Sequence, residues 1–287
     1  LVLTAILANG HVLIEGVPGV AKTLLARLTA RLIDADFSRV QFTPDLMPSD
    51  VLGTTVFNMK TNGFDFHQGP IFADIVLVDE INRAPAKTQA ALFEVMEERQ
   101  ISIDGTTHRM GNLYTILATQ NPVEQEGTYK LPEAQLDRFL MKITMDYPSL
   151  EEEVNILERH HTNAALVKLD DITPAITKEE LLSLRAFMNQ VFVDRTLLQY
   201  IALIVQQTRT SKAVYLGASP RASVAMLQSS KAYALLQGRD FVTPEDIKFV
   251  APYVLQHRLI LTAEAEMEGY SPVKVTQRLI DKVEVPK

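Results

Sequence analysis

Short apolar segments alternate with segments of helical periodicity in the first half of the chain. Strands are expected at residues 11–15, 38–43, 75–79, 113–119 and 139–145, and helices at 22–34 and 86–98. Such alternation is typical of a parallel sheet covered by helices on both faces. The segments "IVLVD" (75–79) and "LYTILAT" (113–119) are the most apolar, so we expect them near the centre of the sheet. This half of the chain therefore belongs to the α/β class.

Helical patterns dominate after Tyr147-Pro148. Helices are expected near 149–161, 177–190, 194–210, 219–237, 243–258 and 271–283. Capping residues indicate four helix starts. Ser149, Thr177 and Thr243 are each followed by an acidic residue three positions later, and Ser219 directly precedes a proline. We predict an α/β domain over 1–147 and an all-α domain over 148–287. Because the chain begins abruptly on a helical pattern, we also expect residues upstream of Leu1.

Two hairpins are expected to interrupt the alternation of strands and helices. Residues 54–68 alternate polar and apolar around Asn62-Gly63, and residues 99–110 do so around Asp104-Gly105. Both dipeptides favour tight turns between antiparallel strands. Either hairpin, taken singly, fits ordinary surface structure.

Composition excludes several classes of protein. The 287 residues contain no cysteine, so neither disulfides nor thiolate chemistry are expected, as in a reducing cytoplasm. The net charge is −7, and no run of lysine or arginine is present, which disfavours binding to nucleic acid. No apolar run approaches the roughly 20 residues of a membrane-spanning helix, and no signal peptide is found.

The stretch "EGVPGVAKT" lies between the first expected strand and helix, where a phosphate-binding loop requires it. Lys22 is expected to reach the β- and γ-phosphates, and the Thr23 hydroxyl to ligate Mg²⁺. The residues expected to contact the nucleotide are Gly16, Val17, Pro18, Gly19, Val20, Ala21, Lys22, Thr23 and Leu24. The general pattern has glycine where this chain has Ala21. We expect Ala21 to begin the helix with negative φ, where a methyl group is tolerated and helix propensity favours alanine. A chance match to the pattern is the alternative.

Polar residues follow the two most apolar strands. Asp79 and Glu80 end the strand 75–79, and ligands bind outside the carboxyl ends of parallel strands. We expect Asp79 to hold Mg²⁺ and Glu80 to deprotonate the attacking water. Asn121, in "ATQNP", is a candidate for orienting that water, and Gln120 is a weaker one. Taken alone, the acidic pair also fits a strand running into solvent, and the asparagine fits turn chemistry.

Two arginines are further candidates. Arg138 precedes the last strand beside Asp137, where a surface ion pair is the simpler account. Arg221 lies in the first turn of an expected helix, where a cation opposes the helix dipole. A triphosphate would suit both Arg221 and the positive start of that helix.

Together these stretches resemble one family, the MoxR-type AAA+ ATPases. The similar segments are "NGHVLIEGVPGVAKT", "DIVLVDEINRAPAKTQAALFEVMEERQ", "ATQNPVEQEGTYKLPEAQLDRFLM" and "GASPRASVAMLQSSKAYAL", which span 9–235. The resemblance implies a sheet of strand order 5-1-4-3-2, a helical lid domain, and ATP with Mg²⁺ as ligands. It assigns Walker A to Lys22 and Thr23, Walker B to Asp79 and Glu80, and alanine at position 21 is part of its pattern.

The resemblance also implies roles for residues outside the loop. Asn121 corresponds to the first sensor and Arg221 to the second, and Arg138 to an arginine finger acting in trans. A finger in trans implies a homo-oligomeric ring, usually a hexamer. The hairpin 54–68 corresponds to the helix-2 insert, and the hairpin 99–110 precedes the first sensor. No catalytic role is assigned to Arg83 or Arg109.

We therefore predict a cytoplasmic, chaperone-like remodelling ATPase, with a von Willebrand factor A domain protein and a client protein as partners. A chelatase-like or motor-like relative is one alternative, which neighbouring genes or an attached partner domain would distinguish. A nucleotide-gated scaffold with little turnover is another, which Glu80, Asn121 and Arg138 disfavour. A DNA-unwinding ring is disfavoured by the acidic charge. Selectivity for adenine is implied by the resemblance alone.

Overall fold

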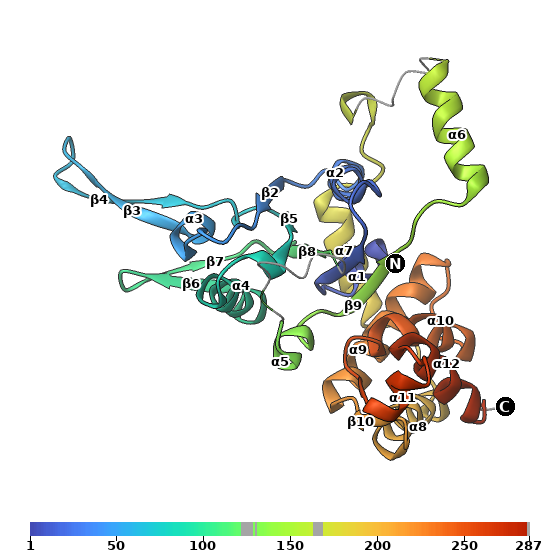
Figure 1. The fold of residues 1–287 in the computed structure, drawn as a ribbon. Coiled ribbons are helices and arrows are strands. Elements are labelled where there is room, and N and C mark those ends of the chain that lie inside the picture. Colours follow the sequence, from blue (N-terminus) through green and yellow to red (C-terminus); the bar gives the residue numbers. More distant parts are fainter. Residues whose placement is uncertain (122–128, 130, 163–168, 286–287) are drawn as a thin grey trace. The chain divides into compact units, whose positions relative to one another are not determined.

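The computed structural model describes residues 1–121, 129, 131–162 and 169–285. The chain forms two compact units, and Figure 1 labels its elements and colours them along the sequence. The sheet unit comprises Leu13–Lys130 and Thr144–Leu182. The helical unit comprises Leu1–Val12, Leu131–Ile143 and Ser183–Lys287. Each unit is discontinuous in sequence, while the boundary near 147–148 stays a prediction.

A five-stranded sheet forms the centre of the α/β part. Its strands are β1 (Val12–Gly16), β2 (Phe37–Gln41), β5 (Ile75–Asp79), β8 (Thr115–Gln120) and β9 (Met141–Met145), in the order β2-β5-β8-β1-β9. Numbered by themselves along the chain, these strands follow the order 2-3-4-1-5. This is the predicted order 5-1-4-3-2 read from the opposite edge. β2 pairs with β5, and β5 with β8, in parallel.

The two most apolar strands lie inside this sheet, as predicted. All five residues of β5 are buried, as are the first five of β8. Strands buried on both faces need near-continuous apolar sequences, which explains the composition of these two segments. Their carboxyl ends carry Asp79 and Gln120.

The sheet unit contains the expected helices together with the short α3 and two 3₁₀ turns, which were not predicted. Its helices are α2 (Lys22–Leu32), α3 (Pro48–Leu52), α4 (Ala86–Glu98) and α6 (Leu150–His161), with 3₁₀ turns at Ile81–Arg83 and Leu169–Asp171. α7 (Lys178–Met188) begins in this unit and ends in the helical unit. At its start, the Lys178 ammonium lies 2.8 Å from Asp36 and 2.6 Å from Asp74.

Both predicted hairpins are present. β6 (Gln100–Ile103) and β7 (Thr106–Arg109) enclose a two-residue turn, in which Asp104 and Gly105 both have positive φ, as predicted. β3 (Gly53–Asn58) and β4 (Gly63–Gln68) form the other hairpin. The two hairpins extend beside each other in Figure 1, and the rings of Phe66 and His108 join them at 4.2 Å between centroids.

The turn of the β3–β4 hairpin differs from the prediction. Gly63 belongs to β4 and pairs with Asn58, so the connection is a four-residue loop over 59–62 rather than a turn at Asn62-Gly63. Asn58 explains the wider loop, because its side chain accepts a hydrogen bond from the Lys60 amide and donates one to Asp65. Asn62 still supplies a left-handed residue, with φ of 50°.

Long helices make up most of the helical unit. They are α8 (Arg195–Thr210), α9 (Pro220–Leu236), α10 (Pro244–Leu255) and α12 (Pro272–Lys282), joined by the shorter α1 (Val2–Leu7), α5 (Glu133–Leu136), α11 (Ala263–Met267), β10 (Val214–Leu216) and β11 (Ile260–Leu261). α9 packs against α1, α8 and α10, and α12 packs against α8 and α10. The four predicted long helices are thus present. α1 agrees with the helical pattern expected at the start of the chain, and the other four shorter elements were not predicted.

Three of the four predicted caps form. At Ser149, Thr177 and Thr243 the capping residue and the acidic residue three positions later exchange hydrogen bonds with each other's backbone. Ser219 is the exception, because its side chain makes no capping bond and its hydroxyl donates to Asp137 at 3.1 Å instead.

Within the described residues, no helix combines the length and apolar character needed to cross a bilayer.

Candidate functional site

The loop between β1 and α2 has the backbone of an anion-binding turn. Gly19 has φ of 86°, and nothing lies within 4 Å of where its Cβ would be. Glycine is therefore needed here for its positive φ and not for lack of space. At Gly16 a side chain would not fit, because a Cβ there would lie 2.6 Å from the carbonyl oxygen of Met145 in β9. The chain then enters α2 at Lys22, so the positive end of an 11-residue helix faces the loop.

Ala21 does not have the expected conformation. It lies just before α2 in the left-handed region, with φ of 57° and ψ of 27°, rather than in the first helical turn. A left-handed conformation costs an L-residue about 1–2 kcal/mol, because the Cβ crowds the following carbonyl. The prediction of negative φ at Ala21 was therefore wrong. The general pattern has glycine at this position because glycine adopts positive φ without this cost.

Lys22 contacts its own loop. Its ammonium donates a 2.7 Å hydrogen bond to the carbonyl oxygen of Gly16. Burial lowers the pKa of Lys22, and the negative charges of Asp79 and Glu80 partly oppose this effect. The structure thus brings the predicted lysine and both predicted carboxylates into one electrostatic environment. Thr23 follows in the first turn of α2, and Leu24 is exposed.

The carboxyl ends of β2, β5 and β8 place polar side chains in a row. Gln41 pairs with Asp79 in the parallel ladder, and Thr119 follows the last paired residue of β8. Asp79 is buried, and one of its oxygens accepts a 2.6 Å hydrogen bond from the exposed Arg39. This carboxylate therefore forms an ion pair with a cationic side chain.

Thr119 joins the two acidic residues and was missed by the sequence analysis. Its hydroxyl donates to Asp79 Oδ1 at 3.1 Å and accepts a 3.0 Å hydrogen bond from the backbone amide of Glu80. The alternation of side chains along a strand places Thr119 on the same side as Asn121. That period could have identified Thr119, since Asn121 was already a candidate.

Glu80 is held by two neighbours. Its Oε2 accepts hydrogen bonds from the Gln41 amide at 2.8 Å and from Arg83 at 2.9 Å. The residue itself is left-handed, with φ of 56°. Non-glycine residues in this region concentrate at functional sites, because the surrounding structure must enforce them. Arg83, which had been given no catalytic role, therefore contacts the predicted base.

Asn121 directly follows β8 and is buried. It succeeds Gln120, which is only partly buried. The sheet unit thus contains Lys22, Thr23, Asp79, Glu80 and Asn121.

Arg138 and Arg221 belong to the helical unit. Arg138 lies between α5 and β9, and Arg221 is the second residue of α9 and is exposed. Asp137, the neighbour of Arg138, accepts a hydrogen bond from Ser219, two residues before Arg221. One carboxylate therefore connects the two segments that carry these arginines.

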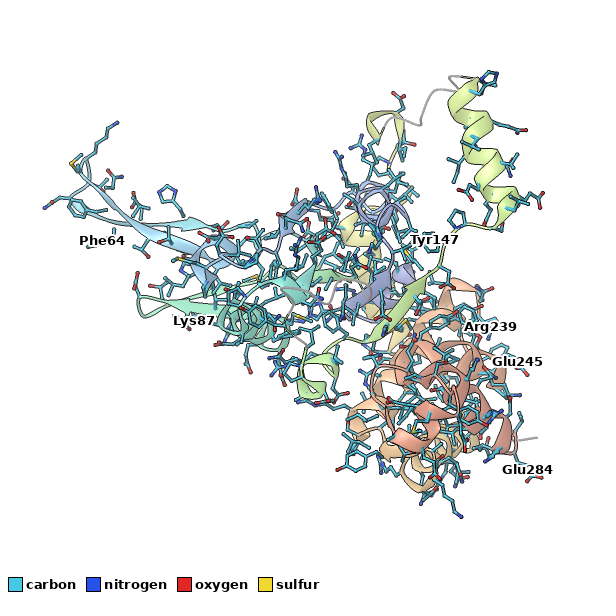
Figure 2. All side chains as sticks on the ribbon, in the orientation of Figure 1. Phe64, Lys87, Tyr147, Arg239, Glu245 and Glu284 are labelled. Carbon is cyan, nitrogen blue, oxygen red and sulfur yellow. The ribbon has the colours of Figure 1, made fainter. Side chains whose placement is uncertain are left out.

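A cavity of about 620 Å³ lies beside the loop within the sheet unit. Gly19, Val20 and Ala21 line it on one side, and the other lining residues are Met145, Asp146, Tyr147, Pro148, Glu152, Asn155, Ile156 and Arg159. Figure 2 shows Tyr147 where the chain leaves β9 for α6. Small-molecule sites commonly have volumes of 300–1,000 Å³ and mostly apolar walls. None of the lining residues after Ala21 was predicted to contact the nucleotide.

Comparisons with known proteins agree with this geometry. Residues 11–141 match the model of the ATPase family associated with various cellular activities (AAA), and residues 206–281 match the AAA lid domain. The chain is 48% identical to the uncharacterized protein YeaC of Bacillus subtilis, over 99% of this chain and 88% of that protein. It is 44% identical to Chaperone MoxR1 of Mycobacterium tuberculosis, over 99% of this chain and 77% of that protein.

A solved structure is similar over the whole chain. The crystal structure of a candidate ATPase from Cytophaga hutchinsonii has a TM-score of 0.90 and 42% identity, covering 100% of this chain and 88% of that one. The phosphate loop, the acidic pair and the five-stranded sheet define an ATPase of the AAA class. Within that class, the chain belongs to the MoxR family.

Proposed function

We propose that this chain is a Mg²⁺-dependent, ring-forming AAA+ ATPase that remodels partner proteins. The observation that carries the proposal is the bonded cluster at the strand ends, in which Thr119 links Asp79 and Glu80 within the electrostatic reach of Lys22. Hydrolysis of a triphosphate needs a phosphate-binding loop, a metal-holding carboxylate and a base, and these residues provide all three.

The residues fit ATP with Mg²⁺. The left-handed loop and the start of α2 direct backbone amides toward an anion, and Lys22 can exchange its bond to Gly16 for one to phosphate. Thr23 and Asp79 would hold the metal, and Asp79 already pairs with the cationic Arg39. When bound, Mg²⁺ supplies neutralisation of the phosphate charge.

Glu80 is proposed as the general base. Its carboxylate must first leave Gln41 and Arg83, because the oxygen that accepts both of their hydrogen bonds is directed at them and not at a water. The hydrogen bond from the Glu80 amide to Thr119 fixes the backbone while the side chain turns. Asn121 would orient the attacking water.

Arg138 is proposed to act on the nucleotide of a neighbouring subunit, and Arg221 to bind the γ-phosphate as the second sensor. An arginine finger contributes roughly 10³–10⁵ to the rate in other nucleotide hydrolases. Since a finger in trans requires contact between copies, a hexameric ring is the proposed assembly. The cavity lined by Tyr147 and Ile156 is the proposed site for the adenine base.

The hairpins are the proposed contact with partner proteins. Phe57 and Phe64 stack edge to face at 5.2 Å on the β3–β4 hairpin, and the Phe64 side chain is 74% exposed (Figure 2). Exposed aromatic residues at the end of a hairpin suit transient contact with an apolar segment of another protein. We propose a von Willebrand factor A domain protein and a client protein as partners in the cytoplasm, without nucleic acid.

Steady-state ATP hydrolysis tests the proposal. The wild type should turn over ATP in the presence of Mg²⁺, Glu80→Gln should bind ATP but hydrolyse it at least 100-fold more slowly, and Lys22→Ala should be inactive. Removing Mg²⁺ with EDTA should abolish turnover. Equal, near-zero rates in the wild type and in Glu80→Gln would contradict the proposal and favour a nucleotide-gated scaffold.

A further inference from the structure

Three consecutive residues directly after α10 hold the segment that carries Arg138. They are Gln256, His257 and Arg258, and their side chains contact backbone carbonyl oxygens of residues 137–142. Both segments lie in the helical unit. The site described above does not include any of these three residues.

Arg258 makes the largest number of these contacts. Its Nε donates to Asp137 Oδ1 at 2.6 Å, and one terminal nitrogen donates to the carbonyl oxygens of Asp137 and Phe139 at 3.1 and 2.7 Å. The other terminal nitrogen donates to Leu140 O at 3.2 Å and to Val254 O. The carbonyl groups on both sides of Arg138 are thus held by one guanidinium.

The neighbours of Arg258 extend the contact. Gln256 donates a 2.6 Å hydrogen bond to the carbonyl oxygen of Lys142 in β9. His257 Nε2 lies 3.0 Å from Phe139 O and 2.9 Å from a terminal nitrogen of Arg258, and the tautomer of the ring decides which of these two contacts is a hydrogen bond. Burial and the charge of Arg258 lower the pKa of His257, so this histidine is neutral.

The opposite side of the segment is also fixed. The Arg138 amide donates to Gln135 O at 3.2 Å, and the Leu140 amide donates to His11 O at 2.8 Å. Asp137 uses its second oxygen to accept from Ser219, at the start of the helix that carries Arg221. The backbone of residues 137–140 therefore has little freedom, and its position depends on Arg258.

Stability alone does not explain a buried arginine here. The Arg258 side chain is 3% exposed, and a buried ion pair is often no more stabilising than apolar residues of the same size. However, each of its five N–H groups has an oxygen acceptor, and four of the five acceptors belong to residues 137–140. Lysine has three donors on one nitrogen and cannot reproduce this fork.

We propose that Arg258 is a positioning residue for Arg138. It fixes the backbone of residues 137–140 so that the Arg138 side chain reaches the nucleotide of the neighbouring subunit. This inference rests on the trans role of Arg138 proposed above. Misplacing a reacting group by about 1 Å can lower a rate roughly 100-fold, so loss of Arg258 should reduce kcat by that order.

The test compares Arg258→Met with a matched control, Arg239→Met. Arg239 donates through both terminal nitrogens to the buried Asp246 in the same unit, at 2.6 and 2.7 Å, without bonding to residues 137–140, and its side chain is 28% exposed. Both variants lose an arginine–aspartate ion pair of the helical unit, but only Arg258→Met should lose about 100-fold in kcat. Binding of a fluorescent ATP analogue to the variant's own loop should stay within about twofold of the wild type.

A mixing experiment separates positioning from a merely structural effect. Glu80→Gln subunits lack the base but retain Arg138, whereas Arg258→Met subunits retain the base. If subunits assemble at random from equal amounts, about a quarter of the sites combine an intact base with an intact finger. The mixture should therefore hydrolyse ATP faster than the sum of its parts, as should Arg138→Ala mixed with Glu80→Gln.

The outcomes distinguish failure of the positioning role of Arg258 from failure of the trans role of Arg138. A wild-type rate in Arg258→Met, or no gain on mixing when Arg138→Ala does gain, would overturn the role of Arg258. If Arg138→Ala itself keeps the wild-type rate, the trans role of Arg138 is contradicted, and the positioning role of Arg258 falls with it. Should Arg258→Met not fold, Arg258→Lys keeps the charge and most of the packing but cannot reproduce the fork. It must then show a fall in kcat and a gain on mixing.

Discussion

Replacing Ala21 by glycine tests the conformation of the phosphate loop directly. The methyl group of Ala21 lies on a residue with φ of 57°, a conformation that costs an L-residue about 1–2 kcal/mol. Glycine removes this cost but loses about 0.5–1 kcal/mol more backbone entropy on folding. The net expectation is a free energy of unfolding that rises by about 0.5–1 kcal/mol in Ala21→Gly.

A second alanine in the same unit provides the control. Ala90 is exposed in the interior of α4, where glycine should lower the free energy of unfolding by about 1 kcal/mol. Equilibrium urea unfolding, followed by far-ultraviolet circular dichroism without nucleotide, measures both variants against the wild type. The two substitutions should therefore shift the unfolding midpoint in opposite directions. ATP hydrolysis by Ala21→Gly should stay within about threefold of the wild type, because the loop keeps its amide directions.

A fall in stability equal to that of Ala90→Gly would refute this reasoning. It would mean that Ala21 has helical φ in solution, as the helix-start interpretation held. Loss of ATP hydrolysis in a stable Ala21→Gly variant would instead show that the methyl group itself contacts the nucleotide.

Three further substitutions test the site and the sheet unit. Thr119→Val should lower kcat about 10- to 100-fold, because the Glu80 amide loses its partner at a cost of about 1–3 kcal/mol, whereas Thr119→Ser should keep most activity in the same assay. Gln41→Leu should raise basal ATP hydrolysis about fivefold, since Glu80 loses a hydrogen bond of about 1 kcal/mol that holds it away from the water; an unchanged rate would show that this bond does not restrain the base. Lys178→Met should lower the free energy of unfolding by about 1 kcal/mol at pH 7. The hydrogen bond from Lys178 lowers the pKa of Asp36, so this difference should be full above the ordinary pKa near 3.8 and disappear as the pH falls below it, which urea unfolding at several pH values measures.

Elements with a strong local pattern could be predicted from the sequence. α4 has the bounds that its periodicity indicates, and the turn at Asp104-Gly105 follows from two residues that favour positive φ. The β3–β4 loop could not be predicted, because side-chain bonds of Asn58 decide its length. Ser219 shows the same limit, since a partner 82 residues away takes the hydroxyl that local pattern assigns to a cap.

The candidate site was predictable where chemistry follows a motif. Lys22, Asp79 and Glu80 share one environment in the structure, as their positions in the sequence indicated. The conformation of Ala21 was not predictable, because alanine has no preference for the left-handed region and only the closure of the loop imposes it. Arg258 gave no local signal either, because its role depends on acceptors more than 100 residues earlier in the chain.

The contact between Arg258 and Asp137 also orders events during biosynthesis. The two residues are 121 positions apart, so Arg258 is synthesised about 10 s after Asp137 at ordinary elongation rates. All residues of the sheet unit precede Ser183 in the sequence and are therefore synthesised earlier. A nascent chain would thus contain its whole phosphate loop well before Arg258 holds the segment around Arg138. If Arg138 acts in trans as proposed, a partly synthesised chain cannot stimulate hydrolysis by a neighbour until Arg258 has been made.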